Sequence, residues 1–184
     1  MRGSVLTNKE RCYVIGMFIG DGYAVYDKSR HYRVDFSLNS KRDIEVIRYL
    51  KFLLKKAGYN SFDVYDKRYN AVYVRVNSKI LMHYLVGQKN ELRAKKIVNN
   101  RQKVLGLLSG LIDSEGYVGH GEILLSQKDN SVARLMQNLS DFLGLTTSVR
   151  HVPNPKGSYI WRIRVSTKFK KLSHVSQKVL REYV

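Results

Sequence analysis

A nine-residue segment occurs twice in this chain and restricts how the chain can fold. Val14–Gly22 reads VIGMFIGDG, and Leu108–Gly116, which begins 94 residues later, reads LSGLIDSEG. Both copies are mainly apolar, and small residues recur in or just before them at intervals of four: Gly16 and Gly20 in the first, and Gly106, Gly110 and Ser114 in the second. Small residues at this spacing form a smooth helix face on which a second helix can lie at nearly backbone distance. The repeat therefore predicts two helices that pack on each other.

Each copy ends with an acidic residue followed by glycine, Asp21 in the first and Glu115 in the second. The glycines are predicted to end the helices in the left-handed conformation, which puts each carboxylate at the negative end of its helix dipole. Two helices lying side by side would gather both carboxylates and several terminal carbonyl groups, an arrangement that needs a cation between them. Because all of these ligands are oxygens, we expect a hard divalent ion such as Mg²⁺ rather than zinc.

The duplication continues beyond the two motifs. After each acid the sequence predicts an extended stretch, an amphipathic helix that ends at glycine, two further strands and a closing helix. These segments are residues 31–38, 41–57, 62–67, 71–77 and 79–86 in the first half, and residues 121–127, 131–143, 147–152, 159–166 and 168–183 in the second. The pattern predicts an α+β protein of two pseudo-symmetric αββαββα halves, residues 1–97 and 98–184, each with an antiparallel sheet and joined through the motif helices into one compact unit.

Short matches set the register between the halves. VRVNSK at Val74–Lys79 corresponds to IRVSTK at Ile163–Lys168, an offset of 89 residues. Helix-capping pairs are expected before both motif helices. These pairs are Thr7 with Glu10, and Asn99 with Gln102. Since both signals recur, the sequence indicates duplication of a whole fold and favours a monomer that already contains both halves.

The charge of the chain indicates its class of partner. Its 33 Lys and Arg residues against 15 Asp and Glu give a net charge of +18, and 13 tyrosines are interspersed with the basic residues. This composition favours a nucleic acid. A membrane is the weaker candidate, because no basic amphipathic stretch is set apart and no apolar run reaches transmembrane length. The single cysteine and the absence of a signal-peptide pattern predict an intracellular protein of the cytoplasm, associated with the nucleoid.

Strand alternation predicts where a nucleic acid would bind. In the strand after Ala71, the residues Tyr73, Arg75 and Asn77 share one face, opposite two valines. The matching strand of the second half carries Arg162 and Arg164 in the same way. A sheet with one basic, hydrogen-bonding face suits the major groove of double-stranded DNA, although such a face could also serve only solubility. The predicted DNA-binding residues are Arg33, Lys41, Arg68, Arg75, Arg150, Arg162 and Arg164.

The two motifs and the order of elements around them resemble those of LAGLIDADG homing endonucleases of the single-chain, two-motif type, most closely the short enzymes encoded in archaeal introns. LSGLIDSEG keeps most of the signature, and VIGMFIGDG is more diverged but keeps the terminal acid and glycine. The resemblance implies that Asp21 and Glu115 bind divalent metal, Mg²⁺ with Mn²⁺ as a substitute, assisted by the backbone carbonyls of Gly20 and Ser114. It further implies a double-strand break with short 3′ overhangs at a long asymmetric target, in support of intron homing.

The same resemblance assigns roles to polar residues near the motifs. Gln127 and Lys128 match a glutamine–lysine pair in which the lysine polarises the attacking water or offsets charge. The first half has Leu38 and Asn39 at those positions, with Lys41 two residues later, so either Lys41 reaches the site or only one half supplies a lysine and the strands are cut sequentially. Asp113 also follows the signature, and we expect it to form hydrogen bonds at the helix interface rather than bind metal.

Three other functions are compatible with such a fold. The protein could be a maturase that binds its intron RNA, a DNA-binding regulator that does not cut, or a structural protein in which the motif helices are only a packing seam. Two carboxylates held beside phosphates would weaken simple binding by repulsion. The acids at both motif ends therefore favour cleavage.

Overall fold

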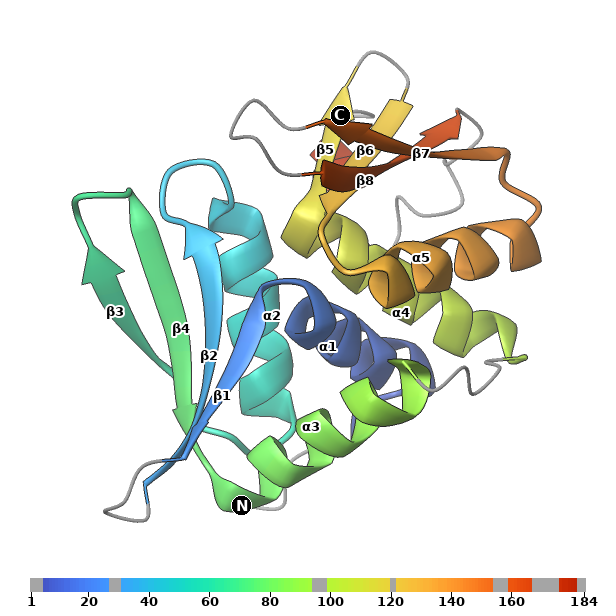
Figure 1. Ribbon diagram of the computed structural model, residues 1–184. Helices are drawn as coiled ribbons and strands as arrows, with labels where there is room; N and C mark the ends of the chain where they lie inside the picture. Colours follow the sequence, from blue (N-terminus) through green and yellow to red (C-terminus); the bar gives the residue numbers. More distant parts are fainter. Residues whose placement is uncertain are drawn as a thin grey trace.

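A computed structural model describes residues 5–26, 31–93, 99–119, 122–153, 159–166 and 176–181 of the 184-residue chain. It has the predicted α+β architecture, with two four-stranded antiparallel sheets and the motif helices between them (Figure 1). The first half consists of α1 (Asn8–Asp21), β1 (Gly22–Tyr26), β2 (Tyr32–Asn39), α2 (Ile44–Lys56), β3 (Phe62–Asp66), β4 (Ala71–Asn77) and α3 (Lys79–Arg93). The second consists of α4 (Arg101–Glu115), β5 (Gly116–Gly119), β6 (Glu122–Gln127), α5 (Asn130–Phe142), β7 (Thr147–Pro153), β8 (Tyr159–Ser166) and α6 (Gln177–Arg181).

The motif helices α1 and α4 lie side by side at the centre of the molecule, as the small residues predict (Figure 1). A side chain at Gly16 would overlap the carbonyl oxygen of Leu107, and one at Gly110 would overlap that of Tyr13. The two backbones are therefore too close for any larger residue at the crossing. Because each helix is buried on nearly all sides, its apolar residues do not need to form a single stripe.

The two helices begin with side-chain caps. Thr7 and Glu10 form the predicted capping box, in which each side chain accepts a hydrogen bond from the backbone N–H of the other. In the second half the prediction was wrong by one residue. The cap is Asn100, whose side chain accepts hydrogen bonds from the backbone N–H groups of Gln102 and Lys103.

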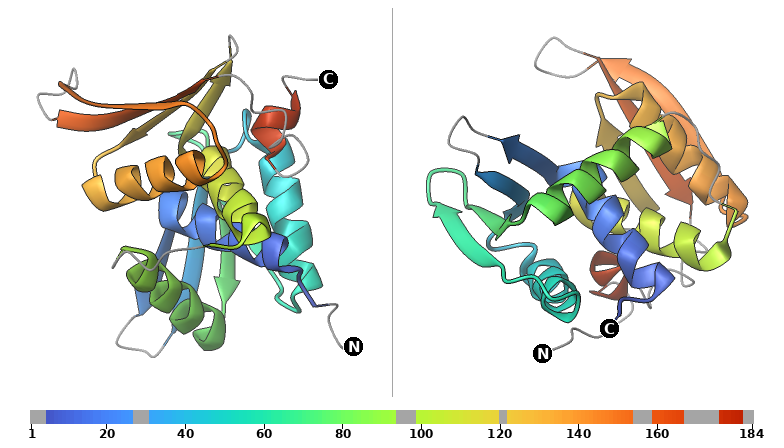
Figure 2. Two further views of the ribbon diagram at one scale, coloured as in Figure 1. Left: turned by 90° about the vertical axis from the view of Figure 1, so that its right-hand side faces the viewer. Right: turned by 90° about the horizontal axis from the view of Figure 1, so that it is seen from below.

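The sheets have equivalent strand orders, β1-β2-β4-β3 and β5-β6-β8-β7. Val72, Val74 and Val76 of β4 are buried, as are Ile163 and Val165 of β8, whereas the basic residues between them lie on the other face. The predicted alternation is confirmed. Helices cover one face of each sheet and leave the other open (Figures 1 and 2).

Several boundaries differ from the prediction. The strands β1 and β5 follow directly after the acids, where no strand was delimited from the sequence. Helix α2 begins at Ile44 rather than at residue 41, because residues 40–42 form a turn held by the Asn39 side chain. Helix α3 continues to Arg93. Residues 168–175, 182 and 183 of the last predicted helix, residue 121 of a predicted strand, and the proposed boundary between residues 97 and 98 lie outside the described residues.

The closing helices connect the halves. Helix α3 packs on α1 of its own half and on α5 of the other, and α6 likewise packs on α4 and on α2 (Figure 2). Within the described residues, no helix is both long and apolar enough to cross a membrane.

Candidate active site

A polar pocket of about 560 Å³ lies where the motif helices end. Asp21 from α1 and Glu115 from α4 line it together, along with residues from both halves that include Asn39, Asp43 and Lys178. The central sequence prediction was that the two acids lie near each other. The structure places them in one pocket.

Both carboxyl groups are strongly affected by burial. Removal from water is the main cause that raises the pKa of Asp21 to about 7, and the negative charge of Glu115 adds to it while Lys178 opposes it. Burial likewise raises the pKa of Glu115, although a hydrogen bond from the Gln127 side chain, 3.1 Å long, and the charge of Lys178 act in the other direction. Two partly buried acids with elevated pKa values would be stabilised in their ionised form by an added cation.

The glycines after the acids differ in conformation from the prediction. Gly22 has φ −92° and ψ 141°, and Gly116 has φ −87° and ψ 144°, so both are extended rather than left-handed. Each is the first residue of the strand that follows directly after its helix. A side chain at Gly22 would overlap Phe18, and one at Gly116 would overlap the carbonyl oxygen of Ile112. Glycine is required here for space and not for a positive φ.

The oxygen atoms of the pocket suit a hard divalent cation. Besides the two carboxylates, the backbone carbonyls of Ser114 and Gly116 are close enough to the pocket to accept hydrogen bonds from the Lys178 ammonium group. Oxygen donors of this kind, with water completing the shell, are what Mg²⁺ and Ca²⁺ use. Across the parts of the chain that the structure describes, no three His, Cys, Asp or Glu side chains cluster to hold a metal. A metal here would therefore depend on backbone oxygens, water or substrate as well as on Asp21 and Glu115.

The polar pairs after β2 and β6 are arranged alike. Gln127 accepts hydrogen bonds from the backbone N–H groups of Lys128 and Asp129, and Asn39 does so from those of Lys41 and Arg42. The strand register nevertheless keeps Leu38 as the counterpart of Gln127, because Leu38 pairs with Val72 as Gln127 pairs with Trp161, at the predicted offset of 89. Leu38 lies in the hydrophobic core.

The two candidate lysines are less clearly placed. Lys41 and Lys128 are both exposed and neither lines the pocket with the acids. Arg42, next to Lys41, does line it. The two alternatives, that Lys41 reaches the acids or that only the second half supplies a lysine, both stay predictions.

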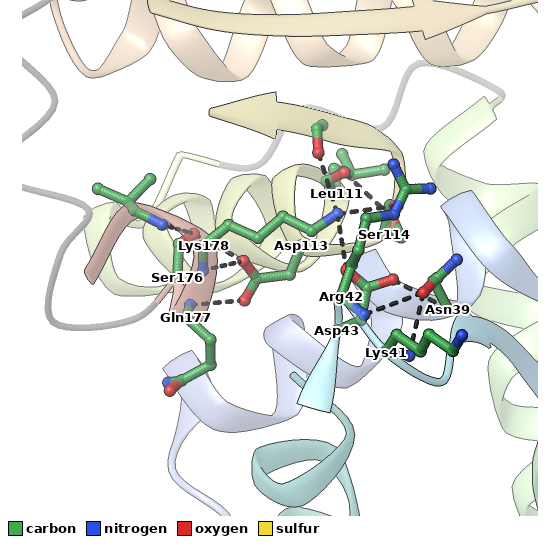
Figure 3. A network of polar contacts seen from close by, with 12 residues as sticks. Asn39, Lys41, Arg42, Asp43, Leu111, Asp113, Ser114, Ser176, Gln177 and Lys178 are labelled. Carbon is green, nitrogen blue, oxygen red and sulfur yellow. Dashed lines mark hydrogen bonds and ion pairs between the residues drawn. The ribbon is translucent and has the colours of Figure 1, made fainter. Parts of the chain in front are cut away.

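Asp113 forms hydrogen bonds at the interface of the motif helices, as expected, and it also binds residues at the start of α6 (Figure 3). Its fully buried carboxylate accepts a 2.8 Å hydrogen bond from the hydroxyl of Tyr13 on α1. It also accepts hydrogen bonds from the Ser176 hydroxyl and from the backbone N–H groups of Gln177 and Lys178 at the start of α6. One buried acid thus joins α1, α4 and α6.

The predicted DNA-binding arginines divide into two groups. Those on the first sheet and its β3–β4 turn pair with acids in this structure. Asp35, which is fully buried, forms a bidentate hydrogen-bonded ion pair with Arg75 and a further contact with Arg33, and Arg68 pairs with Asp66. Arg164 on the second sheet contacts Glu122 at 3.1 Å.

Arg150 and Arg162 form the second group. They are exposed and lie directly opposite each other on β7 and β8. Like charges at such a pair destabilise a sheet in isolation, and a polyanion on this face would relieve the repulsion.

Two pocket residues were missed from the sequence. Asp43 precedes α2, and its carboxylate accepts a hydrogen bond from the Asn39 N–H and lies 3.7 Å from the Lys178 ammonium group. Lys178 itself had a signal in the sequence, because Gln177–Lys178 matches Gln88–Lys89 at the same offset of 89 that relates the strands.

Comparison with known proteins agrees with the geometry. Residues 102–181 match the family model of the LAGLIDADG-like domain. The uncharacterized protein MJ0398 of Methanocaldococcus jannaschii is 29% identical over 153 residues, which are 81% of this chain. The chain spans about half (54%) of the length of that relative.

Solved structures extend the likeness to the first half. Mesophilic variants of the homing endonuclease I-DmoI superpose with a TM-score of 0.70 at 19% identity, over 91% of this chain and 94% of theirs. I-DmoI in complex with DNA and Ca gives a TM-score of 0.71 at 19% identity, over 91% of this chain and 88% of that one. Full-length WhiA from Thermatoga maritima gives 0.60 at 14% identity, over 98% of this chain and 63% of that one. Residues 102–181 thus match the model of a LAGLIDADG-like domain, and the chain as a whole shares the fold of the homing endonuclease I-DmoI.

Proposed function

We propose that this protein is a site-specific DNA endonuclease that makes a double-strand break with short 3′ overhangs at a long asymmetric target, in a reaction that needs Mg²⁺ or a substitute such as Mn²⁺. The observation that carries the proposal is the shared pocket of Asp21 and Glu115, one partly buried acid from each half. A protein that only binds nucleic acid gains nothing from two partly buried carboxylates at the place where its halves meet.

Asp21 and Glu115 would hold the metal, with help from the backbone oxygens of Gly20 and Ser114. A bound divalent ion supplies stabilisation of the charge that develops on the phosphate and on the leaving oxygen. The protein's own residues orient these ligands. The Gln127 amide fixes the Glu115 carboxylate by its hydrogen bond, and the close packing of α1 on α4 fixes the spacing of the two helix ends.

The open faces of the two sheets would bind double-stranded DNA on either side of the cut. Arg33, Lys41, Arg68, Arg75, Arg150, Arg162 and Arg164 are the proposed contacts. The ion pairs of Arg75 with Asp35 and of Arg164 with Glu122 would orient these guanidinium groups for base edges, and the exposed pair of Arg150 and Arg162 would meet phosphates.

We further propose that residues 1–97 and 98–184 act as the two recognition halves of one monomer, and that the protein acts inside the cell on nucleoid DNA in support of intron homing. The archaeal relative that shares 29% identity is consistent with an archaeal intron as the setting.

The test begins with selection of bound sequences from a random double-stranded DNA library in Ca²⁺, followed by incubation of the enriched DNA with Mg²⁺. Cleavage in Mg²⁺ that is lost in Asp21→Asn and in Glu115→Gln, with binding retained, supports the endonuclease. DNA that is specifically bound but stays intact in both Mg²⁺ and Mn²⁺ supports a regulator instead. A preference for structured intron RNA over any enriched DNA supports a maturase. Binding with no sequence preference, weakening with salt as for any polycation, supports none of the three.

A further inference from the structure

Lys178 is the most enclosed basic group of the pocket. Its side chain is only 11% exposed. The ammonium group donates a 3.0 Å hydrogen bond to the Gly116 carbonyl, lies 3.4 Å from the Ser114 carbonyl, and contacts Asp43 at 3.7 Å (Figure 3). It thus lies against oxygen atoms on both sides of Glu115.

This position is enforced by the fold. The backbone N–H of Lys178 donates to the carboxylate of Asp113, as does that of Gln177, so the first turn of α6 is fixed to α4 two residues before Glu115. From there the side chain of Lys178 extends along α4 to Ser114 (Figure 3). A lysine on a free surface would pay a large rotamer entropy to adopt one such conformation, whereas here α6 and the pocket walls hold it.

The first half delivers an equivalent lysine. Lys89 of α3 corresponds to Lys178 at the offset of 89, and its ammonium group lies 5.3 Å from the centre of the Phe18 ring on α1. The positive charges of both lysines lower the pKa of Glu115. The duplicated fold therefore directs one lysine from each closing helix toward the acidic pair.

We propose that Lys178 is a built-in cation of the acidic centre, and that its ammonium group occupies oxygen atoms that a divalent metal would use, so that metal must displace it to bind. The inference rests on the proposed function only in taking Asp21 and Glu115 as the metal centre. In the absence of metal, the positive charge of Lys178 offsets the negative charges of Asp21 and Glu115 and the partial charges of the Ser114 and Gly116 carbonyls. On metal binding it would leave the Ser114 carbonyl and become available to a phosphate.

The test is Ca²⁺ binding to the protein without DNA, measured by isothermal titration calorimetry. Lys178→Met should bind Ca²⁺ at least about tenfold more tightly than the wild type, because a like charge within a few ångströms of the ion has been removed. Lys178→Arg, which keeps the charge, should bind weakly like the wild type. Lys56→Met is the matched control, since Lys56 is another largely buried lysine, 23% exposed, that pairs with Glu10 away from the pocket. It should leave Ca²⁺ affinity unchanged.

Equal affinity in Lys178→Met and the wild type, including no measurable binding by either, overturns the inference, and so does weaker binding by the variant. A second measurement needs no substitution at all. In wild-type protein with ¹³C-labelled lysine side chains, Ca²⁺ should shift the Lys178 signal and leave that of Lys56 in place. If the chain binds Ca²⁺ and the Lys178 signal does not move, displacement does not occur.

These outcomes are independent of cleavage. If the protein never cuts DNA but its Lys178→Met variant binds Ca²⁺ more tightly, the proposed function is refuted and this inference is supported. If the protein cuts DNA and the variant binds Ca²⁺ as the wild type does, the proposed function is supported and this inference is refuted.

Discussion

Asp21→Asn should make the protein less sensitive to alkaline pH. In the folded chain the pKa of Asp21 is raised from 3.8 to about 7, chiefly by burial and then by the charge of Glu115. Between those two values the folded state holds a proton that the unfolded state has released. Stability therefore falls as pH rises through this window, and the loss is complete above the folded pKa. Asparagine cannot ionise and avoids the loss.

The magnitude follows from the width of the window. From pH 5 to about pH 7 the unfolded carboxyl is ionised and the folded one is not, so the wild type loses about 1.4 kcal/mol per pH unit from this group. Over pH 5 to 8.5 the total is roughly 2 to 3 kcal/mol, large compared with a typical stability of about 5 to 15 kcal/mol.

The assay is urea denaturation at pH 5, 6, 7 and 8.5 with a chelator present, for wild type and Asp21→Asn. The variant should gain stability over the wild type as pH rises, and added Mg²⁺ should reduce the difference by favouring the ionised wild-type acids. Glu45→Gln, which alters an exposed ion pair with Arg48, should give a curve parallel to the wild type. If Asp21→Asn also runs parallel to the wild type over the whole range, the argument that Asp21 is held in a desolvated site beside Glu115 is refuted.

Two further predictions concern the seam between the halves. Gly16→Ala should destabilise the protein by about 2 kcal/mol or more, because the new methyl group overlaps the Leu107 carbonyl on the facing helix, whereas Gly87→Ala on the open side of α3 should be neutral or stabilising by about 0.5 to 1 kcal/mol. Equal urea midpoints for these two variants would show that the helices can separate freely. Tyr13→Phe removes one of four hydrogen bonds to the buried Asp113 and should cost about 1 to 3 kcal/mol in the same assay, while Tyr65→Phe, on an exposed side chain, should change stability by less than about 0.5 kcal/mol. A loss for Tyr13→Phe no larger than that of Tyr65→Phe would mean that the Asp113 network contributes little.

The sheets and most of their boundaries could be predicted because their signals are local. Alternation along Ala71–Asn77 and along Tyr159–Ser166 distinguishes the buried face from the open face without knowledge of the rest of the chain. The strands β1 and β5 were not delimited, because each begins at the glycine that ends a motif, which was predicted as part of the helix terminus. Each is held by pairing with the next strand along the chain, β2 or β6.

The pairing of the acids was predictable for a different reason. Glycines at intervals of four have few uses other than close helix packing, and two copies in one chain most simply pack on each other. That argument brings Asp21 and Glu115 together with no knowledge of angles or distances. It could not give the conformation of Gly22 and Gly116, because the extended backbone there brings each glycine against the last turn of its own helix, at Phe18 and at Ile112.

The amino-acid sequence alone determined the duplication, the helix seam, the basic faces of the sheets and the two acids, since each is written in the type and spacing of neighbouring residues. Only the tertiary structure decided what surrounds the acids. Lys178 and Asp43 reach the pocket from opposite halves, and Asp113 fixes the helix that carries the lysine. Such contacts join residues that are distant in the chain, and they depend on side-chain directions that no periodicity encodes.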